Sequence, residues 1–89
     1  MACYIVTFEL TESSRLPALK TALKSFGGYC PLNATSWAIL SEKKATEVRD
    51  ELAAVLGAGD RLFIIRSGSE GAWRNSYGEK HNEWLKKNL

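Results

Sequence analysis

The residue of this chain best suited to a catalytic or metal-binding role is the acidic residue Glu9. Glu9 ends an N-terminal run of small and strand-forming residues, 2–8. A carboxylate at the end of a strand is suited to hold a divalent cation, or to act as base toward a metal-bound water, in phosphodiester hydrolysis. The competing interpretation is a solvated carboxylate beside the next helix N-terminus, which favours negative charge. Glu12 lies in the adjacent loop, and Asp60 more simply belongs to a turn, because Gly57-Ala58-Gly59-Asp60 has turn composition.

Positive charge gathers in the last third of the chain. Residues 1–60 contain six Lys/Arg and seven Asp/Glu, a net of −1, whereas residues 61–89 contain six and three, a net of +3. One interpretation is a phosphate-contacting surface with interleaved aromatic rings that stack on bases. The other is a solvated tail whose aromatic residues serve packing. The candidate nucleic-acid-binding residues are Arg66, Arg74, Lys80, Lys86 and Lys87, with Trp73 and Tyr77.

The sequence argues against several other kinds of site. Two cysteines, Cys3 and Cys30, and a single histidine, His81, lack the paired spacing of a zinc site, and His81 has no evident partner for a role as base. We expect the two thiols to be reduced and unlinked. No apolar run approaches the roughly 20 residues that span a bilayer, so we expect a soluble, cytoplasmic protein with no membrane contact.

The spacing of apolar residues predicts six elements in the order strand, helix, strand, strand, helix, strand. The first helix follows the polar residues 11–14, carries Pro17 in its first turn and ends at Gly27-Gly28. Pro31 confines the second strand to a sheet edge or a bulge, and Asn33-Ala34 is the expected turn after it. The four strands are expected at 2–9, 29–32, 35–41 and 61–66, and the second helix at 42–56 with Gly57 as its stop.

This order predicts an α+β, ferredoxin-like βαββαβ domain over residues 1–66. Right-handed crossovers place both helices on one face of a four-stranded antiparallel sheet whose strands are ordered four-one-three-two. Cys3 and Cys30 then lie two strands apart, too far for a disulfide. Residues 67–89 are expected to form a loop and a short helix over 79–89, anchored by Trp84 and Leu85, which packs on the body or on a partner protomer. The open sheet face is apolar and requires a cover, either this tail or a second copy of the chain.

Four stretches of the sequence carry a family resemblance. They are Tyr-Ile-Val-Thr-Phe-Glu-Leu at 4–10, Ser-Trp-Ala-Ile-Leu at 36–40, Asp-Arg-Leu-Phe-Ile at 60–64, and Trp73 with Trp84-Leu85-Lys86. Together they resemble the SinR-like proteins, relatives of the small CRISPR-associated adaptation protein and of VapD ribonucleases. The resemblance implies a ferredoxin-like homodimer whose sheets face each other, with C-terminal segments often exchanged between protomers.

The same resemblance bears on Glu9. In that group the first strand commonly ends in Tyr-Asp, and the two aspartates of a dimer are proposed to hold a divalent metal near the two-fold axis. Phe8-Glu9 is the matching pair here. The resemblance therefore implies Mg²⁺ or Mn²⁺ as cofactor and Glu9 as its ligand. Glutamate is longer by one methylene group and places its oxygens differently around a metal that demands near-ideal octahedral geometry.

Three functional hypotheses follow. The leading one is a small homodimeric nucleic-acid-associated module with little or no nuclease activity, which contacts RNA or DNA through its basic C-terminal third. The second is a metal-dependent endonuclease that uses Glu9 from both protomers. The third is a protein-interaction adaptor, or a regulator of a mobile element or toxin system, which binds a protein partner through the edge strand 29–32 or the tail.

Overall fold

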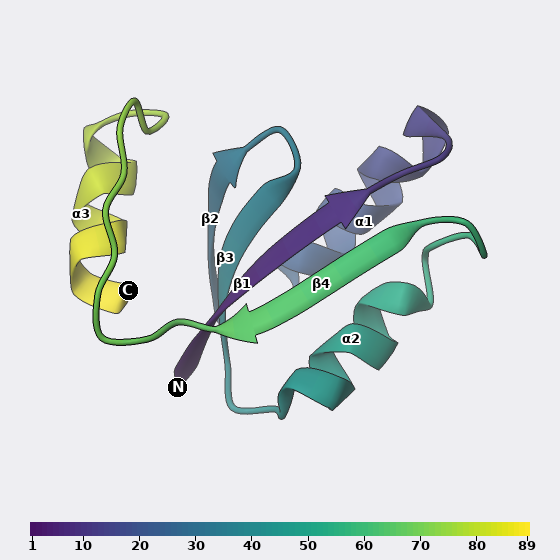
Figure 1. Ribbon diagram of the computed structural model, residues 1–89, viewed down its shortest axis with the longest axis horizontal. Helices are drawn as coiled ribbons and strands as arrows, with labels where there is room; N and C mark the ends of the chain where they lie inside the picture. Colours follow the sequence, from purple (N-terminus) through teal and green to yellow (C-terminus); the bar gives the residue numbers. More distant parts are fainter.

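Four strands form one antiparallel sheet in a computed structural model that describes residues 1–89 (Figure 1). The strands are β1 (Ala2–Glu9), β2 (Gly28–Asn33), β3 (Ser36–Ser41) and β4 (Arg61–Arg66), in the order β2-β3-β1-β4. The predicted ferredoxin-like fold and strand order are confirmed. The helical elements are η1 (Ser13–Arg15), α1 (Leu16–Lys24), α2 (Ala45–Ala53) and α3 (Glu79–Asn88).

Helices α1 and α2 cover one face of the sheet and enclose the main core. Alternate residues of β1, Tyr4, Val6 and Phe8, belong to the same buried cluster as Leu19 of α1 and Leu52 of α2. Pro17 lies in the first turn of α1, where its missing N–H removes no helical hydrogen bond. The apolar side chains that alternate along β1 and those at helical spacing along α1 thus pack in one layer, as the sequence predicts.

The predicted ends of α2 and the predicted position of one turn were wrong, and local hydrogen bonds explain the start of the helix and the turn. Helix α2 begins at Ala45 because the Lys43 N–H donates to Ser41 Oγ (3.0 Å) in a turn, and the Lys44 N–H donates to Glu47 Oε1 (2.9 Å), which marks Lys44 as the helix cap. The β2–β3 turn lies at residues 34–35 because Asn33 Oδ1 accepts from the Thr35 N–H (3.0 Å). As predicted, β2 is an edge strand, with a register irregularity between Pro31 and Asn33.

Helix α3 covers part of the second face of the sheet. Its Leu85 is buried against Cys3, Cys30 and Ala38, with Trp84 packed beside them. Neither cysteine forms a disulfide, as predicted, and burial raises the pKa of both thiols, so they are protonated and apolar at neutral pH. No helix of the chain is long and apolar enough to cross a membrane.

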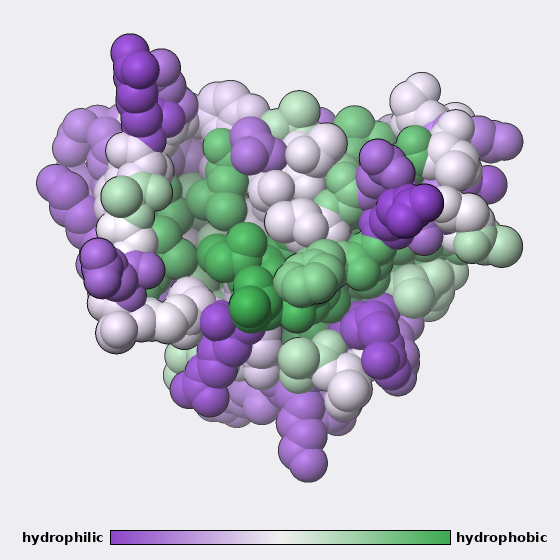
Figure 2. Space-filling view, viewed as in Figure 1, coloured by the Kyte–Doolittle hydropathy of each residue, from purple (hydrophilic) through white to green (hydrophobic).

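The part of that second face over β1 and β4 has no cover. Phe63 is 63% exposed and Ile65 55% exposed, and both project on the same side of the sheet as their cross-strand partners Thr7 and Ile5. Figure 2 shows the hydrophobic band that results across this side of the molecule. The tail therefore covers only part of the open face.

Candidate functional site

Glu9 lies at the end of β1, opposite Arg61 of β4 in the sheet register. The Glu9 carboxylate forms an ion pair with the Arg61 guanidinium, Oε1 to Nε 3.2 Å, and the two side chains are 75% and 83% exposed. An ion pair this exposed contributes about 0–1 kcal/mol to stability. Its local effect is to place a positive charge beside the one carboxylate proposed as a metal ligand.

The residues around Glu9 do not fit a divalent metal within one chain. No group of three or more His, Cys, Asp or Glu side chains lies close enough together to hold a metal ion. Magnesium prefers several oxygen ligands in octahedral geometry, whereas Glu9 offers one carboxylate that an arginine already contacts. A single protomer therefore provides no metal centre for hydrolysis.

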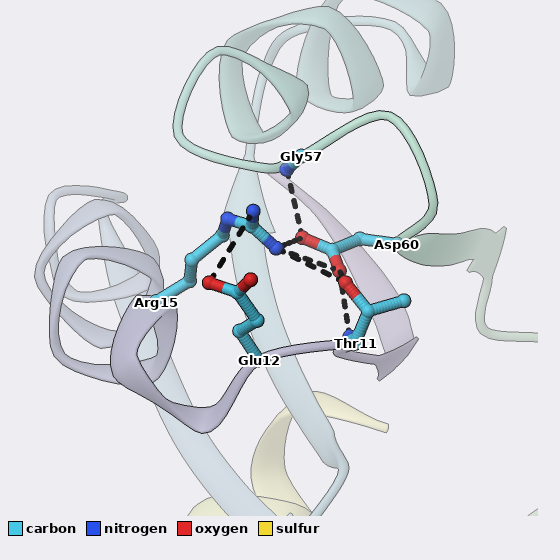
Figure 3. A network of polar contacts seen from close by, with 5 residues as sticks. All are labelled: Thr11, Glu12, Arg15, Gly57 and Asp60. Carbon is cyan, nitrogen blue, oxygen red and sulfur yellow. Dashed lines mark hydrogen bonds and ion pairs between the residues drawn. The ribbon is translucent and has the colours of Figure 1, made fainter.

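Asp60 is occupied by a structural network beside this end of the sheet (Figure 3). Its Oδ1 accepts from the Thr11 N–H (2.8 Å) and hydroxyl (2.9 Å), and its Oδ2 accepts from the Gly57 N–H (2.7 Å). The Arg15 guanidinium lies 3.3 Å from both carboxylate oxygens. Asp60 thus joins the loop after β1 to the turn before β4, and its interpretation as a turn residue is confirmed.

Gly57 permits the close approach of Arg15 to this network. A Cβ atom at Gly57 would lie 2.5 Å from Arg15 Cζ, well inside van der Waals contact. Helix α2 has already ended at Ala53. The Arg15 guanidinium thus fills the space beside Gly57, and Gly57 is not the helix stop that the sequence predicts.

Because Asp60 accepts these bonds as a carboxylate, the stability of the protein at low pH tests its role in the network. The Thr11 N–H bond, the Gly57 N–H bond and then Arg15 lower the pKa of Asp60 from 3.8 to about 2, against an opposing effect of burial. A lowered folded-state pKa stabilises the fold above the unfolded value, and this contribution disappears as the pH falls from about 4 to about 2. We expect Asp60→Asn to be less stable than wild type at pH 7, with a difference that shrinks toward pH 2.

Urea unfolding at pH 7, 4 and 2 measures this difference. Asp50→Asn is the matched control, because Asp50 is 70% exposed and pairs only with the adjacent Arg49. A stability difference between wild type and Asp60→Asn that stays constant with pH would contradict the assignment.

The predicted basic surface is divided by the structure. Arg66, Trp73 and Arg74 do come together, along a groove of about 550 Å³ between the C-terminal end of β4, the edge strand β2 and the tail. We call this the tail groove. Lys86 lies beside Trp73 but lines a different hollow, whereas Lys80 and Lys87 line another one near Gly28. Tyr77 is 61% exposed and contacts His81 edge-on, with ring centroids 6.0 Å apart.

Glu9 and the tail groove are separate sites. In the β1–β4 pairing Glu9 is opposite Arg61, and Tyr4 is opposite Arg66, so Glu9 and Arg66 are five residues apart along the ladder. At about 3.4 Å per residue this corresponds to roughly 17 Å. The two sets of residues that the sequence singles out therefore cannot act together on one phosphate within one chain.

Two residues that the sequence analysis misses hold Trp73 in place. The Trp73 indole N–H donates to Asn82 Oδ1 of α3 (2.9 Å), and the Ser76 hydroxyl donates to the same oxygen (2.5 Å). Asn82 also donates through Nδ2 to Glu79 Oε2 (3.2 Å). The signal in the sequence was weak: Asn82 is a polar residue one helical turn before the anchor Leu85.

No protein-family model matches the chain, and no curated protein matches it. Among solved structures, the crystal structure of a hypothetical protein from Thermus thermophilus matches with a TM-score of 0.68 and 21% sequence identity, over 83% of this chain and 90% of that one. A likeness at this identity shows the fold alone. Function has to be argued from the surface of this chain.

Proposed function

We propose that this chain is a homodimeric nucleic-acid-binding module of the SinR-like group, with little or no nuclease activity, which contacts phosphates through Arg66 and Arg74. The observation that carries the proposal is the tail groove, which these two arginines line together with Trp73. The ion pairs of the chain involve Arg15, Lys43, Arg49 and Arg61, so the guanidinium groups of Arg66 and Arg74 are free.

The chemistry of the groove suits a nucleic acid. A guanidinium group presents a planar fork of N–H donors that matches phosphate oxygens. Trp73 adds an aromatic surface. Proteins that bind single-stranded nucleic acid commonly combine cationic side chains with aromatic rings on which the bases stack. Glu70 also lines the groove, so the charged side chains that line it sum to one net positive charge.

The uncovered hydrophobic band supports the dimer. Phe63 and Ile65 are large apolar side chains that lie side by side on one face of an edge strand and remain mostly exposed. Such a patch on a small protein marks a contact surface. A second copy that places its own band against this one would bury the same residues from both chains, as a two-fold interface requires.

Salt-dependent binding tests the nucleic-acid proposal. We expect labelled RNA or DNA to bind at low salt and the affinity to fall steeply as salt rises, because each phosphate contact releases counterions. Arg66→Gln with Arg74→Gln should lower the affinity and reduce the slope of log K against log salt by about 1–2 per protomer. Fluorescence anisotropy measures both quantities.

The control removes the same charge elsewhere. Lys20→Gln with Lys24→Gln deletes two exposed cations from α1, on the other side of the sheet, and should leave the salt slope nearly unchanged. Failure of the wild type to bind any nucleic acid at low salt would contradict the proposal and favour the protein-adaptor hypothesis. Cleavage in Mg²⁺ or Mn²⁺ that a chelator and Glu9→Gln both abolish would instead support the endonuclease hypothesis.

A further inference from the structure

We propose that the tail groove is a base-binding site, in which an unstacked base of a single strand lies against Trp73 while neighbouring phosphates contact Arg66 and Arg74. The inference rests on the proposed function and adds to it a substrate class: single-stranded nucleic acid in preference to duplex. It follows from the shape and lining of the groove and from how Trp73 is held.

The lining of the groove is more apolar than phosphate binding alone would need. Six aliphatic or proline side chains larger than that of alanine contribute to it, from three strands and the tail. Its volume of about 550 Å³ falls within the range of about 300–1,000 Å³ typical of sites that enclose a small organic group. The six residues are Ile5, Pro31, Leu32, Ile65, Leu85 and Leu89.

A duplex cannot use such a surface. In a double helix the flat faces of the bases stack on each other, and the outside presents phosphates, sugars and base edges. An apolar hollow would be desolvated by a duplex without receiving an apolar group in return. An unstacked base brings a flat, weakly polar face to the groove and carries phosphates on both sides of it.

Trp73 is held ready for this contact. Trp73 is 38% exposed, and the hydrogen bond from its Nε1 to Asn82 fixes the ring edge against α3. Trp73 borders two adjoining hollows, the tail groove and the one that Lys86 lines. Binding therefore requires little reordering of the ring, and Lys86 is placed to meet the strand as it leaves the groove.

Charge decides between a nucleotide and a peptide as the occupant. Arg66, Arg74 and Trp73 all line the groove, and each nucleotide of a single strand supplies both a base and a phosphate. A peptide would need an aromatic residue flanked by acidic residues to match the same groups. Ile65 belongs both to the groove and to the hydrophobic band, so the dimer proposed above would take Ile65 out of the groove and the base-binding site rests on the other lining residues. The test therefore uses the full chain in its native oligomeric state.

The experiment compares a labelled single strand of ten nucleotides with the same sequence in a blunt duplex, by fluorescence anisotropy at one low salt concentration. We expect the wild type to prefer the single strand by about tenfold, within the range of a single base–aromatic stack. Trp73→Leu should lose about tenfold in single-strand affinity and leave duplex affinity unchanged. Trp73→Phe, which keeps a ring but not the hydrogen bond to Asn82, should retain most of the preference.

Tyr29→Leu is the control, since Tyr29 is a 42% exposed aromatic residue of β2 that contacts Trp37 and not the groove. Circular dichroism confirms that each variant is folded. Equal affinity for the two substrates, or an equal loss for both in Trp73→Leu, would overturn the base-binding site and leave phosphate binding by the arginines in place. Absence of binding to either substrate would overturn the site and the proposed function together, and tight binding of an aromatic acidic peptide in place of the single strand would reassign the groove.

Discussion

Truncation of Leu85 to alanine is expected to release the C-terminal helix while the rest of the fold stays intact. Leu85 is 2% exposed and is the one fully buried residue of α3. Loss of a buried leucine side chain costs about 2–5 kcal/mol. Because an isolated helix of ten residues is marginal in water, α3 has little stability of its own to oppose that loss.

Local and global unfolding can be told apart in this variant. Hydrogen exchange of the amides in 79–88 should accelerate strongly, and trypsin should cut after Lys80, Lys86 and Lys87, while amides of β1 and β3 keep their protection. Glu83→Ala is the matched control, because Glu83 is an exposed residue of the same helix. Unchanged protection of α3 in Leu85→Ala would show that other contacts hold the helix.

Release of α3 would also remove the tail groove. Asn82, which holds Trp73, and Leu85 and Leu89, which line the groove, all belong to this segment. We therefore expect Leu85→Ala to lose single-strand preference although Arg66 on β4 is still in place. The packing of α3 on the sheet and the proposed binding surface therefore both depend on the Leu85 side chain.

The sequence predicts best the elements in which a continuous run of apolar residues stops at a charged residue. Strand β1 was predicted at 2–9 and β4 at 61–66, and both agree residue for residue, because an apolar run stops at a charged side chain in each case. Helix α2 was predicted too long at both ends. Its residues have helical composition throughout, and the hydrogen bonds that Ser41 and Glu47 accept from the Lys43 and Lys44 N–H groups decide where the helix begins.

The candidate site was predictable only in part, for a geometric reason. The strand order and register bring Arg61 to Glu9, so that contact follows from the sheet. The division of the basic residues depends on how α3 is rotated on the sheet, which puts Lys80 and Lys87 on one side and Lys86 on another. The position of Trp73 depends on a loop in which Asn75 adopts a φ of 57°, a conformation that composition does not reveal.

Replacement of Phe63 by glutamate is expected to turn the proposed dimer into a monomer. In the isolated chain Phe63 is 63% exposed, so this substitution removes little packing from the protomer. In a dimer formed through the hydrophobic band, the glutamate would be buried against the apolar side chains of the second copy. The cost of burying an unpaired charge is several kcal/mol, which corresponds to a rise of at least about 100-fold in the dimer dissociation constant.

Light scattering at micromolar concentration tests this directly. Wild type should show twice the chain mass of 9.9 kDa, Phe63→Leu should remain dimeric, and Phe63→Glu should show the chain mass alone. Tyr29→Glu introduces the same charge at an exposed aromatic position of β2 that belongs to the helix-covered face, and should leave the dimer intact. A monomeric wild type would refute the dimer itself. A dimeric Phe63→Glu would move the interface away from the band, because an interface centred on Phe63 has no means to accommodate two buried carboxylates related by a two-fold axis.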